Sequence, residues 1–213
     1  MKFKTSHKTI TSYFSDDSGY RPSTHTGIDW VIGYGKPVTT DNAGVIGHVD
    51  LNGSNGWRAV WVLVPYNGAF MEVCYGHLKD IFVEVGQYVL EDETVGTEGN
   101  FGLVYRGGVQ ITPAMRKRGS KAGSHVHEQY RPVRLVKRKT KGKHYRPYKF
   151  EGQYVEIIIE NNRRGCIDPL QFKTNPRDIL MEALKKEFEA VKKGKKDTST
   201  LRILWKVVLK LFK

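Results

Sequence analysis

Cysteine is scarce in this 213-residue sequence, which contains only Cys74 and Cys166. Two cysteines are too few for a disulfide scaffold or for a metal site built on thiolates, so we expect both to be small buried residues. Long hydrophobic runs are also missing. Without 18 consecutive apolar residues, no helix is expected to span a bilayer. The first residues lead into no apolar segment of a secretory signal, and we therefore expect synthesis in the cytoplasm.

Acidic residues are few in two stretches of the chain. The formal net charge is +13, from 35 Lys and Arg against 22 Asp and Glu. Residues 116–149 carry 13 basic residues and the single acid Glu128, and residues 177–213 carry 11 basic and 5 acidic residues. The rest of the chain holds 11 basic and 16 acidic residues and is mildly acidic. The basicity therefore belongs to two attachments on an acidic core.

The residue pattern that is present favours strands joined by tight turns. There are 22 glycines and 11 tyrosines, and Asn-Gly pairs at 52–53, 55–56 and 67–68 are suited to hairpin turns. We expect a mainly β fold with an antiparallel sheet or open barrel, followed by a C-terminal α-helical appendage. The expected strands are residues 27–32, 37–50, 59–65, 70–77, 88–97, 124–132 and 152–160.

The same pattern suggests how the chain is divided. We expect an N-terminal segment of loop over residues 1–20, a β domain over 21–175, and helices over 176–213 that begin after Asn175-Pro176. Within the domain, the glycine-rich residues 101–124 predict a long loop. Residues 131–161 predict a basic excursion from the core, a hairpin with residues 141–143 near its tip.

Three motifs contain histidine: H-T-G-I-D at 25–29, Y-G-H-L at 75–78 and S-H-V-H at 124–127. On a strand, residues two apart face the same side, so His125 and His127 project together. A bend at Gly27 allows His25 and Asp29 to converge. Two histidines and one aspartate around an open fourth position are typical of catalytic zinc. Taken alone, a His-x-His or His-x-x-x-Asp motif is more often a surface pair or a chance match than a metal site.

Other conspicuous side chains have no partner motif. We expect His7, His48 and His144 to be structural or solvated. Trp57 and Tyr75 are expected to pack in the core or line a cleft, and neither is expected to be catalytic.

The combination of motifs resembles the lysostaphin-type zinc metallopeptidases, which are Gly-Gly and D,D-endopeptidases of peptidoglycan with the signature H-x-x-x-D followed downstream by H-x-H. The resemblance covers residues 20–172 and includes V-E-V-G-Q at 83–87, V-G-T-E-G-N at 95–100 and Asp168-Pro169 in the family's order. It implies an all-β peptidase core with His25, Asp29 and His127 as zinc ligands and water as the fourth.

The resemblance also implies a function. A zinc-bound water would attack amide bonds in peptidoglycan peptide cross-links, with His77 and His125 acting as general base and as stabiliser of the tetrahedral intermediate. Which of these two histidines accepts the first proton stays open. Two alternatives are a catalytically inactive wall-binding or scaffold relative and a basic nucleic-acid-binding protein.

The sequence departs from the family pattern in three places. Around the last motif, the family's S-T-G-x-H-L-H-F-E is replaced by A-G-S-H-V-H-E-Q-Y at 122–130, which leaves the ligand positions unchanged. The loop between Asn100 and His125 is long and is expected to wall the cleft and alter substrate choice; its basic residues are Arg116, Lys117, Arg118 and Lys121. The basic excursion has no family counterpart.

The two basic attachments predict partners. For residues 116–149 the candidates are an anionic wall polymer, plain solvation, and nucleic acid stacked on tyrosines. In residues 201–213, basic residues recur at 202, 206, 210 and 213 and form one stripe of an otherwise apolar helix. At about 20 Å this helix is too short to cross a hydrocarbon core of roughly 30 Å. It would lie on a membrane surface or dock on the core or on a partner chain.

A lytic enzyme with such a tail resembles bacteriophage endolysins. That resemblance implies action at the cell wall or periplasm after release from the cytoplasm, or a virion-associated enzyme that cuts the wall locally during entry.

Overall fold

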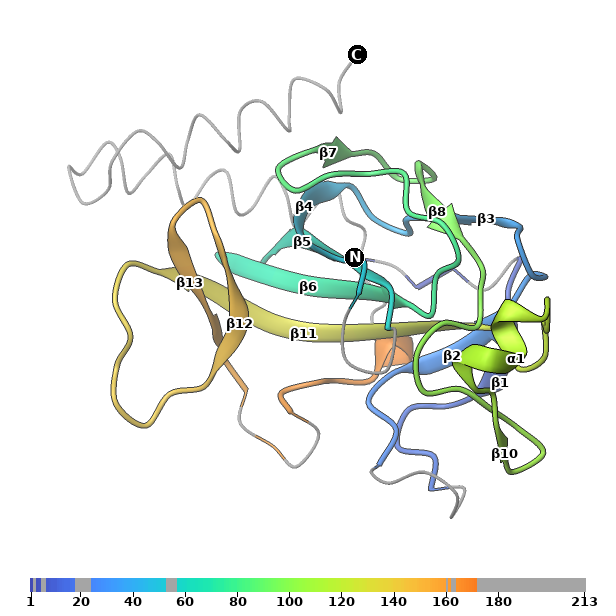
Figure 1. Ribbon diagram of the computed structural model, residues 1–213. Coiled ribbons are helices and arrows are strands. Elements are labelled where there is room, and N and C mark those ends of the chain that lie inside the picture. The colour runs from blue at the N-terminus through green and yellow to red at the C-terminus, as the bar shows by residue number, and fades with distance from the viewer. Residues whose placement is uncertain are drawn as a thin grey trace, which may run out of the picture.

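The computed structural model describes residues 1, 3–4, 7–17, 24–52, 57–159, 161 and 164–171. Within them, nine strands form one antiparallel sheet with the order β1-β2-β11-β6-β5-β4-β7, to which β13 is joined through β11 and β12 through β13 (Figure 1). The expectation of a mainly β antiparallel fold is confirmed. The helical appendage expected over 176–213 lies outside the described residues. No helix in the described part of the chain is long and apolar enough to cross a membrane.

The strands of the large sheet are β1 (Thr9–Ser12), β2 (Ile28–Val31), β4 (Gly44–Asp50), β5 (Ala59–Tyr66), β6 (Ala69–Gly76), β7 (Tyr88–Val89), β11 (Val126–Val136), β12 (Tyr145–Phe150) and β13 (Gln153–Ile157). Two small sheets pair β3 (Pro37–Thr39) with β8 (Thr94–Thr97) and β9 (Tyr105–Arg106) with β10 (Val109–Gln110). A short helix α1 (Pro113–Lys117) and a 3₁₀ turn η2 (Pro169–Gln171) complete the elements.

Several strand boundaries differ from those expected. Residues 37–50 and 88–97 each form two strands, because the chain turns between them; Asp92 in the second turn has a positive φ of 66°. The N-terminal segment, expected as loop, contributes β1, which pairs with β2. The hairpin expected over 131–161 is replaced by three strands, because β11 pairs with β13 and the additional strand β12, which contains Pro147, pairs with the other edge of β13. The pairing of β12 with β13 shifts register between Tyr145 and Lys149.

Strand β11 is the longest of the described strands and organises the sheet. One edge pairs with β6 over residues 127–133. The other edge pairs with β2 over 126–128 and then with β13 over 133–136. Figure 1 shows β11 crossing the molecule from the end that holds β1, β2 and α1 to the end that holds β12 and β13. One strand therefore connects the histidine motifs to the basic excursion.

The two faces of the sheet have different roles. Trp30, Val62, Tyr75 and Tyr130 are fully buried on one face and belong to the main hydrophobic core. Because side chains alternate along a strand, the neighbours of these residues face the opposite side. That second face carries Asp29, His127 and Cys74. Both cysteines are buried free thiols, as expected.

A buried ion network ties the N-terminal strand to the core. The Lys8 ammonium lies 2.6 Å from Asp41 Oδ2 and 2.8 Å from Glu128 Oε2, and all three side chains are fully buried. Glu128 Oε2 also accepts a hydrogen bond from Trp30 Nε1 at 2.9 Å. Trp30 and Glu128 follow Asp29 and His127 directly in sequence, so the network fastens these two positions together from the core side of the sheet. Burial raises the pKa of the Glu128 carboxyl to about 7.

Replacing Lys8 with methionine should therefore destabilise the protein strongly, because it leaves two carboxylates buried without their cation. We expect the free energy of unfolding, measured by urea denaturation, to fall by about 3–5 kcal/mol. The matched control is Lys4→Met, which removes exposed ion pairs to Glu91 and Asp92 and should cost under about 1 kcal/mol. Equal effects of the two substitutions would contradict this role of Lys8.

Candidate metal centre

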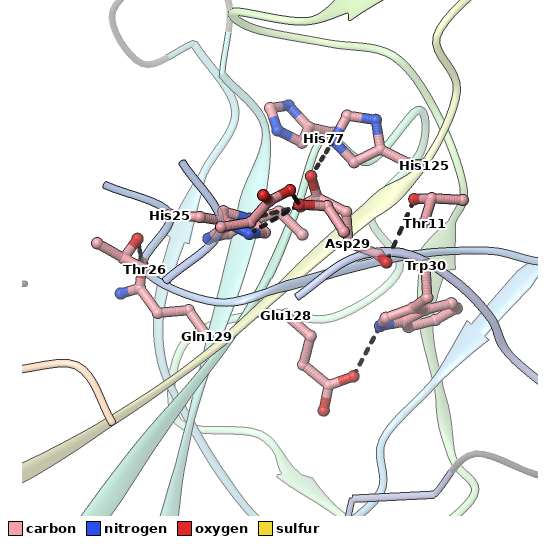
Figure 2. Close-up of polar contacts among 12 residues, drawn as sticks. Thr11, His25, Thr26, Asp29, Trp30, His77, His125, Glu128 and Gln129 are labelled. Carbon is pink, nitrogen blue, oxygen red and sulfur yellow. Dashed lines mark hydrogen bonds and ion pairs between the residues drawn. The ribbon is translucent and has the colours of Figure 1, made fainter. Parts of the chain in front are cut away.

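Strand register brings the histidine motifs to one place. Asp29 on β2 lies opposite His127 on β11, and His127 lies opposite Gly76 at the end of β6. His77 follows Gly76, and His25 is in the segment that leads into β2. Figure 2 shows His25 and Asp29 in contact, with His77 and His125 side by side next to them.

Three donor atoms converge on one point. His25 Nε2 lies 2.9 Å from Asp29 Oδ1 and 3.0 Å from His127 Nδ1, and His127 Nδ1 lies 2.9 Å from Asp29 Oδ1. All three residues are buried and together form a group that could hold a metal ion. Ligand atoms of one tetrahedral zinc lie about 3.3 Å apart, given bonds of about 2.0–2.1 Å. The three atoms are therefore spaced nearly as zinc requires.

Two groups at the end of strand β1 fix the tautomer of His25. His25 Nδ1 lies 2.7 Å from the carbonyl oxygen of Tyr13 and 3.2 Å from the Ser12 hydroxyl. A carbonyl only accepts hydrogen bonds, so Nδ1 carries the proton, and Nε2 of the neutral ring presents a lone pair to Asp29 Oδ1. Two acceptors in such close contact repel each other unless a cation lies between them. The donor set thus fits a metal ion better than it fits a hydrogen-bonded cluster.

The charge state of the group also suits a metal. Burial alone would raise the pKa of Asp29, but the nearby side chains of His127, His25 and His125 outweigh this effect and hold the pKa well below its ordinary value. Burial lowers the pKa of His127 against the opposing effect of Asp29. The carboxylate is therefore ionised and the imidazole neutral at pH 7, which are the protonation states of metal ligands.

Gly27 allows the first motif to approach β11. A Cβ at this position would lie 2.3 Å from the carbonyl oxygen of Glu128 and 2.9 Å from the His127 ring. Only glycine leaves room for this contact. The spacing H-x-G-x-D therefore reflects a close backbone approach as well as a bend.

The two remaining histidines of the motifs flank the group without joining it. The rings of His77 and His125 are 4.5 Å apart, and His125 Nε2 lies 3.8 Å from Asp29 Oδ2. His77 Nδ1 is 2.6 Å from the carbonyl oxygen of Phe101, and His125 Nδ1 is 2.8 Å from that of Gly123. Both rings use Nδ1 to donate to the backbone, so in each neutral ring Nε2 is left as a proton acceptor.

His77 is held in a strained conformation. Its φ of 64° is unusual for a residue other than glycine, and strain of this kind is concentrated at functional sites. Trp57 packs its ring edge-on against His77 with centroids 4.5 Å apart. Burial lowers the pKa of His77 well below the ordinary value, and nearby His125 adds to this effect. His77 is therefore neutral at pH 7.

All five residues line one cleft of about 670 Å³. The long loop forms part of its wall, as expected, through Leu103, Val104 and Tyr105. The basic residues of the loop do not line this cleft; they are Arg116, Lys117, Arg118 and Lys121. The Arg116 guanidinium instead donates to the carbonyl oxygens of Asn100, Gly102 and Ile111 and so holds the loop in place.

The structure separates the other histidines from this group. His7 and His144 are exposed, and His48 stacks on Tyr148 with ring centroids 4.4 Å apart. Tyr75 is buried in the core, and Trp57 lines the cleft.

The carbonyl groups that orient the motif histidines carry no sequence signal. The cleft also extends to Trp61, Arg131 and Arg146, none of which was expected at the site.

An antiparallel sheet with a buried His/Asp/His group and two further histidines in one cleft defines a candidate metallohydrolase. The sequence profile of peptidase family M23 matches residues 23–139, and the chain belongs to this family. The family resemblance inferred from the motifs is thereby confirmed, and the three donors form an intact candidate metal site of an M23 metallopeptidase.

Solved structures of related proteins are similar to this chain. The catalytic domain of EnpA, a prophage-encoded M23 protein from Enterococcus faecalis, is 21% identical with a TM-score of 0.49, covering 81% of this chain and 97% of that one. The catalytic domain of lysostaphin from Staphylococcus simulans is 19% identical with a TM-score of 0.48, covering 76% and 90%. A zinc-containing peptidase from Vibrio cholerae is 17% identical with a TM-score of 0.47, covering 82% and 39%. No curated protein matches the chain significantly.

We expect His127→Ala to abolish stable zinc binding, because one of three protein ligands is lost. Zinc content after dialysis, measured by emission spectroscopy, should fall from about one ion per chain to near zero. His144→Ala removes an exposed imidazole outside the group and should leave the zinc content unchanged. Retention of zinc by His127→Ala would contradict the assigned ligand set.

Proposed function

We propose that the protein is a zinc-dependent endopeptidase that hydrolyses amide bonds in the peptide cross-links of peptidoglycan. The observation that carries this proposal is the buried group of His25, Asp29 and His127, which shares one cleft with His77 and His125. Family membership supports the substrate class, since M23 peptidases act on peptidoglycan.

Each site residue has a role in this proposal. His25, Asp29 and His127 would hold the ion, which when bound supplies Lewis-acid chemistry that activates water and polarises the scissile carbonyl. The Tyr13 carbonyl keeps the His25 lone pair aimed at the group. The single negative charge of Asp29 leaves the loaded site with a net positive charge, which stabilises the oxyanion that develops during attack.

We assign the first proton transfer to His125. Its Nδ1 is committed to the Gly123 carbonyl, and its Nε2 lies 3.8 Å from Asp29 Oδ2, beside the group that holds the ion. The His77 ring centroid lies 6.2 Å from that of His127 and 4.5 Å from that of His125. His77 would stabilise the tetrahedral intermediate in the form protonated at Nε2, from which it can donate to the oxyanion. The proton accepted by His125 would then pass to the leaving amine nitrogen.

The alternatives have less support. An inactive scaffold would have no need for two histidines that keep a free acceptor nitrogen beside an intact ligand set. A nucleic-acid-binding surface is disfavoured because several basic residues already pair with carbonyl or carboxylate groups of the protein itself. Arg116 holds a loop, Arg131 contacts Glu72, and Arg134 contacts Glu156. Action at the wall after release, or from a virion, remains the prediction made from the sequence.

Replacing His125 with alanine should separate catalysis from metal binding. We expect hydrolysis of purified walls, measured by zymogram and by turbidity loss, to fall by about 10²–10⁴-fold because the general base is lost. Zinc content should stay at the parent level, whereas His127→Ala should lose both zinc and activity. Unchanged clearing of the walls by both variants would overturn the proposed function.

A further inference from the structure

The cleft continues from the candidate metal centre along strand β11. Alternate residues of this strand face the cleft, namely His127, Gln129 and Arg131, and all three line it. At about 3.3 Å per residue, Arg131 lies about 13 Å along the strand from His127. The register places Arg131 opposite Glu72 and His127 opposite Gly76 on β6. The floor of the cleft is therefore one straight surface with the metal centre at one end.

The basic excursion closes the other end. Glu72 is fully buried and accepts hydrogen bonds from Arg131 Nη1 at 2.6 Å, from Arg146 Nε at 2.9 Å and from the Tyr148 hydroxyl. Arg146 and Tyr148 belong to β12, so a single carboxylate anchors the excursion to the floor of the cleft. The excursion, which the family comparison left unexplained, thus contributes directly to the cleft that contains the metal centre.

The two arginines at this end of the cleft differ in how many of their N–H groups are hydrogen-bonded. Arg131 also donates Nε to the carbonyl oxygen of Arg164 and lies with Nη2 3.1 Å from the Cys166 thiol. Arg146 makes only the Nε contact with Glu72 among hydrogen bonds to described residues, and 17% of its side chain is exposed. Its two terminal amino groups are therefore available to a ligand. With Arg131, Arg146 and Arg164 against Glu72, this end of the cleft has a net positive charge.

Trp61 adds an unused donor at the same place. This residue of β5 lines the cleft and is only 6% exposed, and the Arg146 guanidinium carbon lies 5.8 Å from its ring centroid. Its indole Nε1 is buried and has no hydrogen-bond partner in the described part of the chain. A buried donor without a partner is costly, and a ligand oxygen entering beside Arg146 would satisfy it.

We propose that Arg146 and Trp61 form a subsite that binds a carboxylate of the peptide substrate, in the part of the cleft that extends along β11 away from the metal centre. The proposal rests on the proposed function and specifies the substrate class of the same cleft. A guanidinium with two free amino groups matches the geometry of a carboxylate, and the indole N–H supplies a further donor. At about 3.3–3.6 Å per residue, an extended peptide covers the distance of about 13 Å between His127 and Arg131, which shares Glu72 with Arg146, in about four residues. The basic excursion is thereby a substrate-selecting element.

The test compares two forms of one probe, a cross-linked muropeptide dimer with its stem-peptide carboxylates either free or converted to carboxamides. Binding is measured by calorimetry with the full-length, zinc-loaded His125→Ala protein, so that hydrolysis does not interfere. Hydrolysis of both forms is measured with the parent protein. We expect the free carboxylate form to bind about tenfold or more tightly, as is typical of hydrogen bonds to charged groups.

Arg146→Gln, introduced into the same background, should reduce this ratio of affinities to about one. The matched control is Arg134→Gln, which removes the same charge from β11 at a half-exposed position paired with Glu156 and should keep the parent ratio. An unchanged ratio in Arg146→Gln would overturn the assignment of this residue.

Trp61→Phe covers the case in which Arg146→Gln fails to fold. It keeps an aromatic ring but removes the unpartnered N–H together with part of the buried indole, so the melting temperature should fall by a few degrees while the protein stays folded. The carboxylate preference should still fall several-fold, which a merely structural role of Trp61 would not cause. An unchanged preference in a folded Trp61→Phe protein would remove Trp61 from the subsite.

The subsite and the proposed function can fail separately. Equal binding of the two probe forms by the His125→Ala protein, with equal hydrolysis of both forms by the parent protein, would overturn the subsite while the peptidase activity stands. A carboxylate preference in binding, lost in Arg146→Gln, without hydrolysis by the parent would support the subsite and overturn the proposed function.

Discussion

The candidate site depends on the pairing of β2 with β11 in the register that places Asp29 opposite His127. Because side chains alternate on strands, a slip of one residue would turn Asp29 or His127, depending on which strand moves, into the core and bring Trp30 or Glu128 into the cleft. The structure opposes such a slip from the core side, where the Trp30 indole donates to Glu128 and Lys8 neutralises that carboxylate. Metal-site geometry is thus specified by buried charge on the far face of the same strands.

Strand β11 carries a second buried ion cluster, on its cleft face. Near its start, Glu128 faces the core and is bound by Lys8; farther along, Arg131 faces the cleft and binds Glu72. Burying charges is expensive unless they are paired, and such pairs contribute to specificity when each group has its partners. Here one cluster fixes the N-terminal strand and the other fixes β12. The cleft therefore has rigid walls at both ends.

Parts of this arrangement follow from sequence, and the reasons differ by residue. Asn67-Gly68, with positive φ at both positions, forms the expected tight turn between β5 and β6. The motifs at 25–29, 75–78 and 124–127 predicted which side chains the structure brings together, because strand alternation and a glycine bend have simple geometric consequences. Strands β12 and β1 were not among the expected strands: β12 contains Pro147, which a sheet interior rarely accepts, and the four residues of β1 carry too little periodic signal.

Other parts depend on contacts between residues that are distant in the sequence. The carbonyl groups of Tyr13, Phe101 and Gly123 orient three histidines, and a backbone carbonyl has no identity in a sequence. Lys8 belongs to a segment whose composition suggests a solvated loop, and its burial depends on two carboxylates distant in the chain. Arg146 lies in a run of basic residues that indicates a charged surface, whereas its position is decided by the buried Glu72 of another strand.

The most direct test of the central claim is mass spectrometry of the products released from purified peptidoglycan by the zinc-loaded protein. We expect new pairs of amine and carboxyl termini within the cross-link peptides, formed only when zinc is present. New reducing sugar ends, release of whole stem peptides from the glycan, or equal cleavage by the zinc-free protein would contradict the claim.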